Sequence, residues 1–343
     1  MSANKYLIVK GKEGLGNRIF SALTGIVYAQ LSGRKLIIDW SDHIYSNDGT
    51  NVFDRIFNCS MNCPTQDIPE TDSINPAVWC GNLHRSVYEM DKLDENITNN
   101  IESRLKFSID PANLHYDEDI LIMWSPSNRV GQLRAHFNGK LEELSSLTTD
   151  NISRKLLSED LKLHPSIRVR VDRFKLERFN KATVGVHVRY TDKTVILSNI
   201  QKILQRLRKR IPDLQVFLST DNENIKTMFE QKYPGIITTP HWYSKQGMPI
   251  HGNQNCPDPT ESCIEALIDL YLLAECDYLI VDTTSSFSYM ANLLTKAPNS
   301  CIFDVKPGEK LLPRLRKFDK RLRNKLRSFI YGPALLGRFL STK

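Results

Sequence analysis

One polar segment of the chain follows an apolar run and contains residue types that bind anions. The run Thr183–Val188 is apolar enough for a buried strand; it includes His187 and is followed by Arg189, Asp192 and Lys193. An arginine after a strand grips a diphosphate through two parallel charge-assisted hydrogen bonds. Asp192 would either hold that arginine or receive a substrate hydroxyl. The same residue types also suit an ordinary loop, so this segment alone does not establish a site.

Two further polar segments follow apolar runs in the same part of the chain. Asp221 comes after one run and would hydrogen-bond a nucleoside or cap the helix that follows. Ser285, Ser286 and Phe287 come after another run and open a helical stretch, where backbone N–H groups favour an anion. The carboxyl ends of parallel strands meet at one edge of a sheet. We therefore expect the three segments to converge on one site.

A glycine-rich turn near the N-terminus offers a second approach to a phosphate or a sugar. Between two apolar runs the chain carries Gly14, Gly16, Asn17 and Arg18. Glycines in such a turn let backbone N–H groups come close to a ligand. Asp39, at the end of the next run, would hold a ribose in a dinucleotide-binding protein, but that motif needs a small residue where this chain has Ile19. A tight turn that simply requires glycine is the remaining alternative.

Carboxylates are the candidates for proton transfer. Glu265 and Asp269 lie one helical turn apart in an apolar stretch, where such residues face either solvent or a cleft. A reaction that consumes a hydroxyl proton needs a nearby carboxylate or histidine. The candidates, in no order, are Asp192, Asp269, Asp282 and His187. The residues that we expect to take part in catalysis are Arg189, Asp192 and Asp269.

The elements that would position these segments alternate between strand and helix. Strands are predicted at 5–10, 35–39, 120–124, 183–188, 214–219, 278–281 and 300–304, with a short one at 236–238. Helices are predicted at 15–32, 165–179, 196–210, 223–232, 261–275 and 286–296, whereas 41–115 shows no clear pattern. This alternation predicts parallel sheets with helices on both faces. A chain of 343 residues has room for two such domains. The predicted fold class is α/β, with two facing Rossmann-like domains and a cleft between them.

We place an N-terminal domain at 1–165 and a C-terminal domain at 166–305. The remaining tail, 306–343, holds twelve Lys or Arg residues against two acidic ones, while the whole chain has a net charge of +7. The basicity therefore belongs to the tail, and we expect no binding of nucleic acid. Apolar residues at helical spacing predict an amphipathic helix over 313–331. It would lie on an anionic membrane or pack back on the N-terminal domain.

Composition narrows the setting of the protein. The chain has no run of 18 apolar residues, and its first apolar stretch is too short for the core of a signal peptide. Seven cysteines without regular spacing favour a reducing compartment. Cys59, Cys63 and Cys80 lack a fourth zinc ligand at a usual spacing. We expect a cytoplasmic protein, peripheral on the inner face of the membrane if the tail binds lipid.

Residues 240–260 are rich in Pro, Gly, Asn, His and Trp, which predicts a long loop. Loops of this length inside a compact domain are usually functional or disordered. With His241, Trp242, Tyr243 and His251, this one would form a lid over an acceptor. The alternative is an excursion without a binding role.

Taken together, these stretches resemble the fucosyltransferase superfamily, which has the GT-B fold, and within it the bacterial nodulation α1,6-fucosyltransferases. The glycine turn and the residues up to 40 are similar to the start of those proteins. His187, Arg189 and Asp192 match their H-x-R-x-x-D motif, and 219–222 and 269–288 resemble their second and third motifs. The Ser-Ser-Phe-Ser run is closer to the α1,2 enzymes. The likeness covers 5–40 and 183–292 and is weak over 41–165.

The resemblance implies an inverting transfer of L-fucose from GDP-fucose to a glycan or lipid-linked oligosaccharide, with no cofactor and no obligatory metal. It implies that the N-terminal domain, 1–165, lies on the acceptor side and that the C-terminal domain, 166–305, binds the nucleotide sugar. It implies that Arg189 binds the β-phosphate, that Asp221 lies near the guanosine and that Asp269 lies close to the donor. The residues expected to bind the donor are Gly14, Gly16, Asn17, Arg18, His187, Arg189, Lys193, Asp221, Ser285, Ser286 and Phe287. Two positions depart from the family. Tyr190 replaces a second arginine, and Leu197 replaces the carboxylate base of the animal α1,6 enzymes, so the general base is unassigned.

Other functions stay open at this point. A GT-B cleft accepts several nucleotide sugars, because a fold does not fix the donor. The departure at Leu197 also suits a non-catalytic protein that binds a glycan or a nucleotide. A dehydrogenase would leave the segments at 187–193 and 282–288 unexplained.

Overall fold

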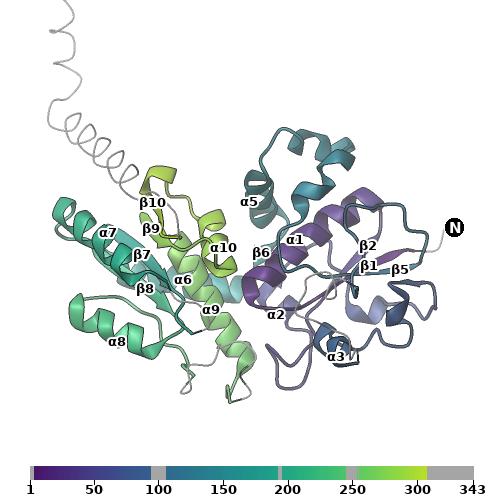
Figure 1. The fold of residues 1–343 in the computed structure, drawn as a ribbon, viewed down its shortest axis with the longest axis horizontal. Coiled ribbons are helices and arrows are strands. Elements are labelled where there is room, and N and C mark those ends of the chain that lie inside the picture. The colour runs from purple at the N-terminus through teal and green to yellow at the C-terminus, as the bar shows by residue number, and fades with distance from the viewer. Residues whose placement is uncertain (1–3, 94–105, 192–194, 245–252, 254, 307–343) are drawn as a thin grey trace, which may run out of the picture.

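Two four-stranded parallel sheets form the framework of the protein in a computed structural model, which describes residues 4–93, 106–191, 195–244, 253 and 255–306 (Figure 1). The first sheet has the order β2-β1-β5-β4 and the second the order β10-β9-β7-β8. The strands of the first sheet are β1 (Tyr6–Lys10), β2 (Lys35–Asp39), β4 (Ile74–Asn75) and β5 (Ile120–Met123). Those of the second are β7 (Thr183–Val188), β8 (Gln215–Thr220), β9 (Tyr278–Val281) and β10 (Ile302–Asp304). The predicted α/β class with parallel sheets is confirmed.

The glycine turn joins β1 to the helix α1 (Leu15–Ser32), which returns the chain to β2. All five residues of β1 are buried, as expected for a central strand covered on both faces. The helix ends at Gly33, whose φ of 68° lies in the left-handed region that glycine adopts without strain. Local patterns thus suffice for this βαβ unit, and the predicted bounds of α1 and β2 are confirmed.

Helices cover both faces of the second sheet. One face packs against α7 (Leu197–Arg210) and α8 (Glu223–Lys232) in a core of its own. The other face packs against α6 (Pro165–Arg178), α9 (Pro259–Ala274) and α10 (Ser286–Leu294). That second core continues into the first sheet and α1. The two sheets are therefore joined by continuous packing on the side of α9 and α10.

The segment that connects the two sheets is irregular. It contains the helices α2 (Phe53–Ile56), α3 (Val87–Lys92) and α5 (Thr149–Glu159), and the short strands β3 (Phe57–Asn58) and β6 (Lys162–Leu163), which pair antiparallel. Short 3-10 helices lie at Thr65–Asp67, Ala77–Trp79, Val130–His136, Gly139–Leu144 and, near β10, Asn299–Cys301. The sequence did not predict these elements, because most are too short to show a periodicity. The strand predicted at 236–238 is wrong: Ile237 makes only an isolated bridge to Phe217.

The helix α5 belongs to this connecting segment but packs on both α1 and α10 (Figure 1). Arg154 donates hydrogen bonds to the Leu293 and Asn292 carbonyl oxygens at the end of α10, at 2.5 and 2.7 Å. Contacts across residue 165 are therefore extensive, and the domain boundary at 165/166 stays a prediction.

In the parts of the chain that the structure describes, no helix is long and apolar enough to cross a membrane. All seven cysteines are free thiols. The predicted tail helix at 313–331 lies outside the described residues, as do Asp192, Lys193 and His251.

Candidate functional site

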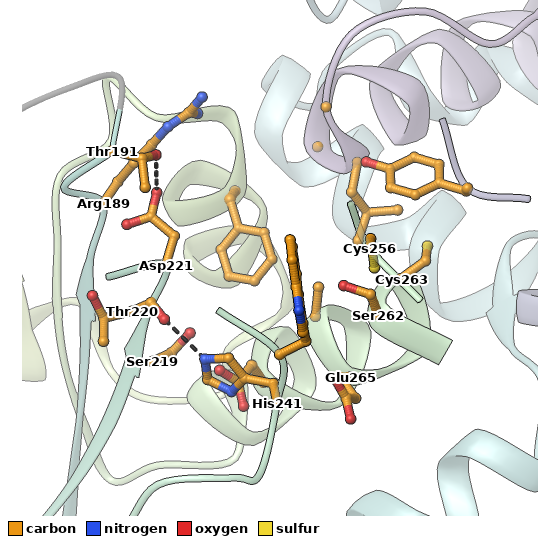
Figure 2. A pocket seen from close by; sticks show the side chains of 18 of the residues that line it. Arg189, Thr191, Ser219, Thr220, Asp221, His241, Cys256, Ser262, Cys263 and Glu265 are labelled. Carbon is orange, nitrogen blue, oxygen red and sulfur yellow. Dashed lines mark hydrogen bonds between the residues drawn. The ribbon is translucent and has the colours of Figure 1, made fainter. Parts of the chain in front are cut away.

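A cavity lies between the two halves of the molecule, at the carboxyl edge of the second sheet (Figure 2). Its walls come from the glycine turn and the loop at 44–45 on one side, and from β7, β8, the 241–242 segment, α9 and α10 on the other. The residues that line it are Gly14, Leu15, Gly16, Ile44, Tyr45, His187, Arg189, Thr191, Ser219, Thr220, Asp221, His241, Trp242, Cys256, Pro259, Ser262, Cys263, Glu265, Ala266, Asp269, Ser286 and Phe287. The expected convergence of the three polar segments is confirmed, because β7 pairs with both β8 and β9.

Asp221 holds the turn that carries Arg189. One of its carboxylate oxygens accepts the Tyr190 N–H at 2.7 Å, and the other accepts the Thr191 hydroxyl at 2.6 Å. The next residue, Asn222, caps α8 by accepting the Ile225 N–H. Of the two roles considered for this segment, helix capping belongs to Asn222. Asp221 holds the turn and lines the cavity, and its contact with a nucleoside stays a prediction.

His187 lies at the end of β7, buried between the sheet and α10. Its Nδ1 is 2.6 Å from the Ser288 hydroxyl, and its ring lies 4.8 Å from that of Phe287. Burial, with the nearby Arg189 charge, lowers the pKa of His187 to about 3. The imidazole is therefore neutral near pH 7 and a weak base, so it is poorly suited to be the general base.

The N-termini of α1 and α10 meet at the cavity. A Cβ on Gly16 would lie 2.6 Å from the Ser286 carbonyl carbon, so only glycine permits this approach. The Ser286 hydroxyl donates to Asn17 Oδ1 across the contact. Gly14 has no side chain to cap α1, and the buried Ser285 hydroxyl before α10 has no partner among the described residues. Two positively polarised helix ends thus face the same space, and this arrangement favours the binding of an anion.

Asp269 forms a buried acceptor group on the α9 wall. It accepts hydrogen bonds from the Thr239 and Ser219 hydroxyls. Burial raises its pKa above the usual aspartate value, and nearby His241 opposes that shift in part. One turn earlier on α9, Glu265 accepts a hydrogen bond from the backbone N–H of Trp242, and burial likewise raises the pKa of Glu265. Of the two expectations for these carboxylates, a solvated helix face is wrong for both, because each lines the cavity.

Aromatic residues of the predicted lid form part of the wall. The His241 and Tyr243 rings are 4.2 Å apart, and His241 Nε2 lies 3.0 Å from the Thr220 carbonyl oxygen. Trp242 lines the cavity next to them. This part of the loop therefore packs against the strand ends, where a planar base or sugar ring would stack.

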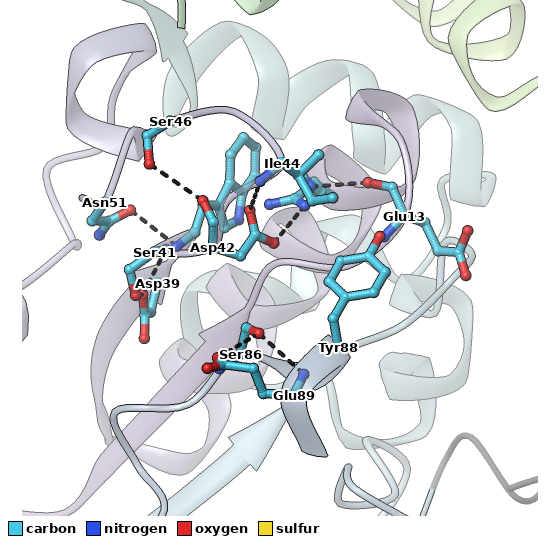
Figure 3. Close-up of polar contacts among 12 residues, drawn as sticks. Glu13, Asp39, Ser41, Asp42, Ile44, Ser46, Asn51, Ser86, Tyr88 and Glu89 are labelled. Carbon is cyan, nitrogen blue, oxygen red and sulfur yellow. Dashed lines mark hydrogen bonds and ion pairs between the residues drawn. The ribbon is translucent and has the colours of Figure 1, made fainter. Parts of the chain in front are cut away.

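The carboxyl edge of the first sheet is a network of buried charges (Figure 3). Arg18 is fully buried; its Nη2 pairs with Asp42 at 2.6 Å, and its Nε donates to the Glu13 carbonyl oxygen at 3.0 Å. Arg18 does not line the cavity. Its guanidinium holds the glycine turn in place and, in this position, does not contact a ligand in the cavity. Asp39 is similarly engaged with Lys10 at 2.7 Å. This carboxylate does not reach the cavity, which removes the main argument for a dinucleotide.

A family model described as Nodulation protein Z (NodZ) matches residues 146–319, just over half of the chain. The chain belongs to the NodZ family. It is 22% identical over 345 residues to the nodulation protein Z of Bradyrhizobium diazoefficiens, covering 91% of this chain and 84% of that protein. It is 24% identical over 317 residues to that of Azorhizobium caulinodans, covering 84% of this chain and 89% of that protein.

Solved structures of NodZ share the fold. A NodZ α-1,6-fucosyltransferase soaked with GDP-fucose superimposes with a TM-score of 0.55 at 20% identity, covering 85% of this chain and 93% of that one. The form co-crystallised with GDP gives 0.55 at 20% identity, with 86% and 93% covered. The GT-B fold expected from the sequence is therefore confirmed.

Within this NodZ-family chain, the structure gathers most but not all of the predicted site residues. Eight line the cavity: Gly14, Gly16, His187, Arg189, Asp221, Asp269, Ser286 and Phe287. Asn17 and Ser285 lie directly behind it, at the start of α1 and α10. Asp282 does not line it; its carboxylate accepts the Thr284 N–H and hydroxyl. Leu197 is the first residue of α7 and is partly buried against the core on that face of the second sheet.

Some cavity residues were not predicted from the sequence. Ile44 and Tyr45 come from the irregular segment after β2, and the Tyr45 carbonyl oxygen accepts the Thr260 hydroxyl at 2.7 Å across the cleft. Cys256 and Cys263 line the wall beside Ser262 (Figure 2). No sequence pattern marked these positions, because their place depends on how the two halves meet. Within the described residues, no three His, Cys, Asp or Glu side chains gather as a metal site.

Proposed function

We propose that the chain is an inverting glycosyltransferase that moves L-fucose from GDP-fucose to a hydroxyl of a glycan. Membership of the NodZ family supports this proposal, as does the fold shared with NodZ structures that were soaked with GDP-fucose or co-crystallised with GDP. We also propose that Lys193 binds the GDP-fucose donor and that Asp192 takes part in catalysis.

The observation that carries the proposal is the meeting of two uncapped helix N-termini beside Arg189. The Gly16–Ser286 contact brings the starts of α1 and α10 together at the cavity that Arg189 also lines. A diphosphate in this space would receive backbone N–H groups, the Ser285 hydroxyl and a guanidinium. These groups would stabilise the charge that develops on the departing GDP, which is where a transferase lowers the barrier most.

The base of the nucleotide is assigned to the wall around Asp269. Guanine presents two adjacent donors, N1–H and the 2-amino group, whereas adenine and uracil do not offer this pair. A buried carboxylate, oriented by the Thr239 and Ser219 hydroxyls, matches those donors. The adjacent Trp242 and His241 rings would stack on the base.

Calorimetric titration of the purified chain with GDP, UDP, ADP and NAD tests the donor class. We expect micromolar GDP binding, about −8 kcal/mol. Arg189→Ala should weaken it at least 30-fold, about 2 kcal/mol, through the lost charge-assisted hydrogen bonds. Arg170→Ala is the matched control, since Arg170 pairs with Glu261 on the molecular surface. Tight UDP or NAD binding with no GDP signal would contradict the proposal.

Inosine diphosphate sharpens the assignment of Asp269, because it lacks only the 2-amino group of GDP. Wild-type protein should prefer GDP over inosine diphosphate about tenfold, and Asp269→Asn should bind GDP more weakly and lose that preference. A preference that persists in Asp269→Asn would place the base elsewhere.

We also propose that the acceptor is a glycan or lipid-linked oligosaccharide and that segment 313–331 binds an anionic membrane. The excess of cations in the tail supports membrane binding. Co-sedimentation with vesicles containing phosphatidylglycerol is the test. Unchanged binding after deletion of 313–343 would contradict it.

A further inference from the structure

A shallow pocket lies where α7 and α8 end. Figure 1 shows both helices on the side of the second sheet that is turned away from the first sheet. Gln205, Arg208, Lys209, Lys232 and Tyr233 line it. We propose that this pocket binds a phosphate group. The inference does not depend on the proposed transferase activity, because none of these residues contributes to the cavity between the two halves.

The three cations of the pocket have no acidic partner in the described part of the chain. Among the described residues, no carboxylate lies within ion-pair distance of Arg208, Lys209 or Lys232. The cations of α6 behave differently. Arg168 and Lys175 share Glu275 at 2.8 and 2.7 Å, and Arg170 pairs with Glu261 at 2.6 Å. Three cations of α6 are thus paired with carboxylates, whereas the three cations at the ends of α7 and α8 are not paired within the described residues.

The helix ends do not account for all of that charge. A helix C-terminus carries about half a negative charge, so cations in the last turn are favourable. Two such ends, at Arg210 and Lys232, supply about one negative charge between them. Three cations line the pocket, so roughly two positive charges are left for an anion from solution.

Tyr233 supplies the second, independent observation. The residue is only 4% exposed, and its hydroxyl is buried with no hydrogen-bond partner among the described residues. Its ring is held against the Arg208 guanidinium at 4.9 Å and against the Phe229 ring at 5.5 Å. A buried hydroxyl without a partner costs free energy, and a phosphate oxygen beside Arg208 would accept a hydrogen bond from it.

The donor set favours phosphate over a carboxylate. A guanidinium, two ammonium groups, the Gln205 amide and a phenol all donate and approach from several directions. The tetrahedral arrangement of phosphate oxygens satisfies donors that do not lie in one plane. Its negative charge, nearly two for inorganic phosphate or a monoester and one for the phosphodiester of a lipid headgroup, offsets the uncompensated positive charge. The phosphate would come either from a soluble phosphate compound or from a lipid headgroup.

Titration with inorganic phosphate, followed by ³¹P NMR line broadening, tests the site in the full chain. All proteins carry Arg189→Ala, so that any phosphate in the central cavity contributes equally. The site variant is Arg208→Gln with Lys209→Gln and Lys232→Gln. The control removes the same charge from exposed lysines with no ion pair in the described structure, through Lys92→Gln, Lys181→Gln and Lys296→Gln. Thermal melting confirms that each variant folds.

The site variant should lower the phosphate affinity at least about tenfold relative to the control, and Tyr233→Phe should lower it about threefold. Vesicles containing phosphatidylglycerol identify the source. A matching loss of vesicle binding in the site variant alone indicates a lipid headgroup, and a loss confined to inorganic phosphate indicates a soluble compound. If the site and control variants bind phosphate within twofold of each other, the charge acts without a site and the proposal is wrong.

Discussion

The carboxyl edges of the two sheets carry similar polar residues but use them in opposite ways. At the second edge, Arg189, Asp221 and Asp269 line the cavity. At the first edge, Arg18 and Lys10 are buried and paired with Asp42 and Asp39 at 2.6 and 2.7 Å. A charge that is removed from water needs a partner, so the charged residues of the first edge form ion pairs with one another. The second edge instead places its polar side chains along the cavity wall, where a ligand would contact them.

Aromatic rings reinforce the closed character of the first edge. The Arg18 guanidinium lies 4.7 Å from the Tyr45 ring, and Lys12, paired with Asp91, lies 4.4 Å from the Trp124 ring. Tyr45 also lines the cavity. The buried network therefore supports one wall of the site without offering its charges to the ligand, and the two edges are separable by mutation.

The largest expected effect contrasts two arginines. Arg18→Ala leaves Asp42 buried without its counter-ion and should lower the free energy of unfolding by about 3–5 kcal/mol. Arg189→Ala should change it by less than about 1 kcal/mol while abolishing most GDP binding. Urea unfolding of both variants measures the contrast. Replacing the pair together, with Arg18→Met and Asp42→Leu, should cost less than the sum of the single changes. Equal losses for Arg18→Ala and Arg189→Ala would remove the distinction between the edges.

A smaller effect concerns His187, which is buried at the second edge with a neutral partner, Ser288. Its pKa is about 3 in the folded protein and about 6.5 when unfolded, so the unfolded chain binds the extra proton first as the pH falls. The contribution of His187 to the free energy of unfolding is therefore full above pH 6.5 and is lost as the pH falls toward 3. Between pH 7 and pH 4 the loss should be about 3 kcal/mol. His187→Asn should remove that component from the pH dependence of urea unfolding, and an unchanged slope would contradict the assignment.

The smallest expected effect concerns the contact between the edges. A methyl group on Gly16 would force α1 and α10 apart, so Gly16→Ala should cost about 1–3 kcal/mol and weaken GDP binding. Gly33→Ala is the control: it meets no atom within 4 Å, but φ at 68° makes it cost about 1–2 kcal/mol. Thermal melts should show similar losses of stability, and calorimetry should show weaker GDP binding only for Gly16→Ala. Full affinity in Gly16→Ala would mean that the helix N-termini do not bind the diphosphate.

Local patterns predicted the second edge more completely than the first. The strand at Thr183–Val188, the helix at Glu223–Lys232 and the strand at Tyr278–Val281 were each predicted with the observed bounds. Adjacent parallel strands then bring Arg189, Asp221 and Ser286 together without further information. The role of Arg18 at the first edge was not predicted from the sequence. An arginine in a glycine turn resembles a ligand-binding residue until the structure shows Asp42 beside it.

The sequence by itself determined the strand–turn–helix units and the side chains at each strand end, since hydrophobic periodicity and glycine turns act over a few residues. Tertiary structure decided which charged groups line the cavity and which are buried in ion pairs. Arg18 meets Asp42 across 24 residues, and Asn17 meets Ser286 across 269. Contacts of such separation depend on how the sheets pack, and no local propensity encodes them. Packing sets the solvation of each charge, and solvation decides whether an arginine binds a ligand or stabilises the fold.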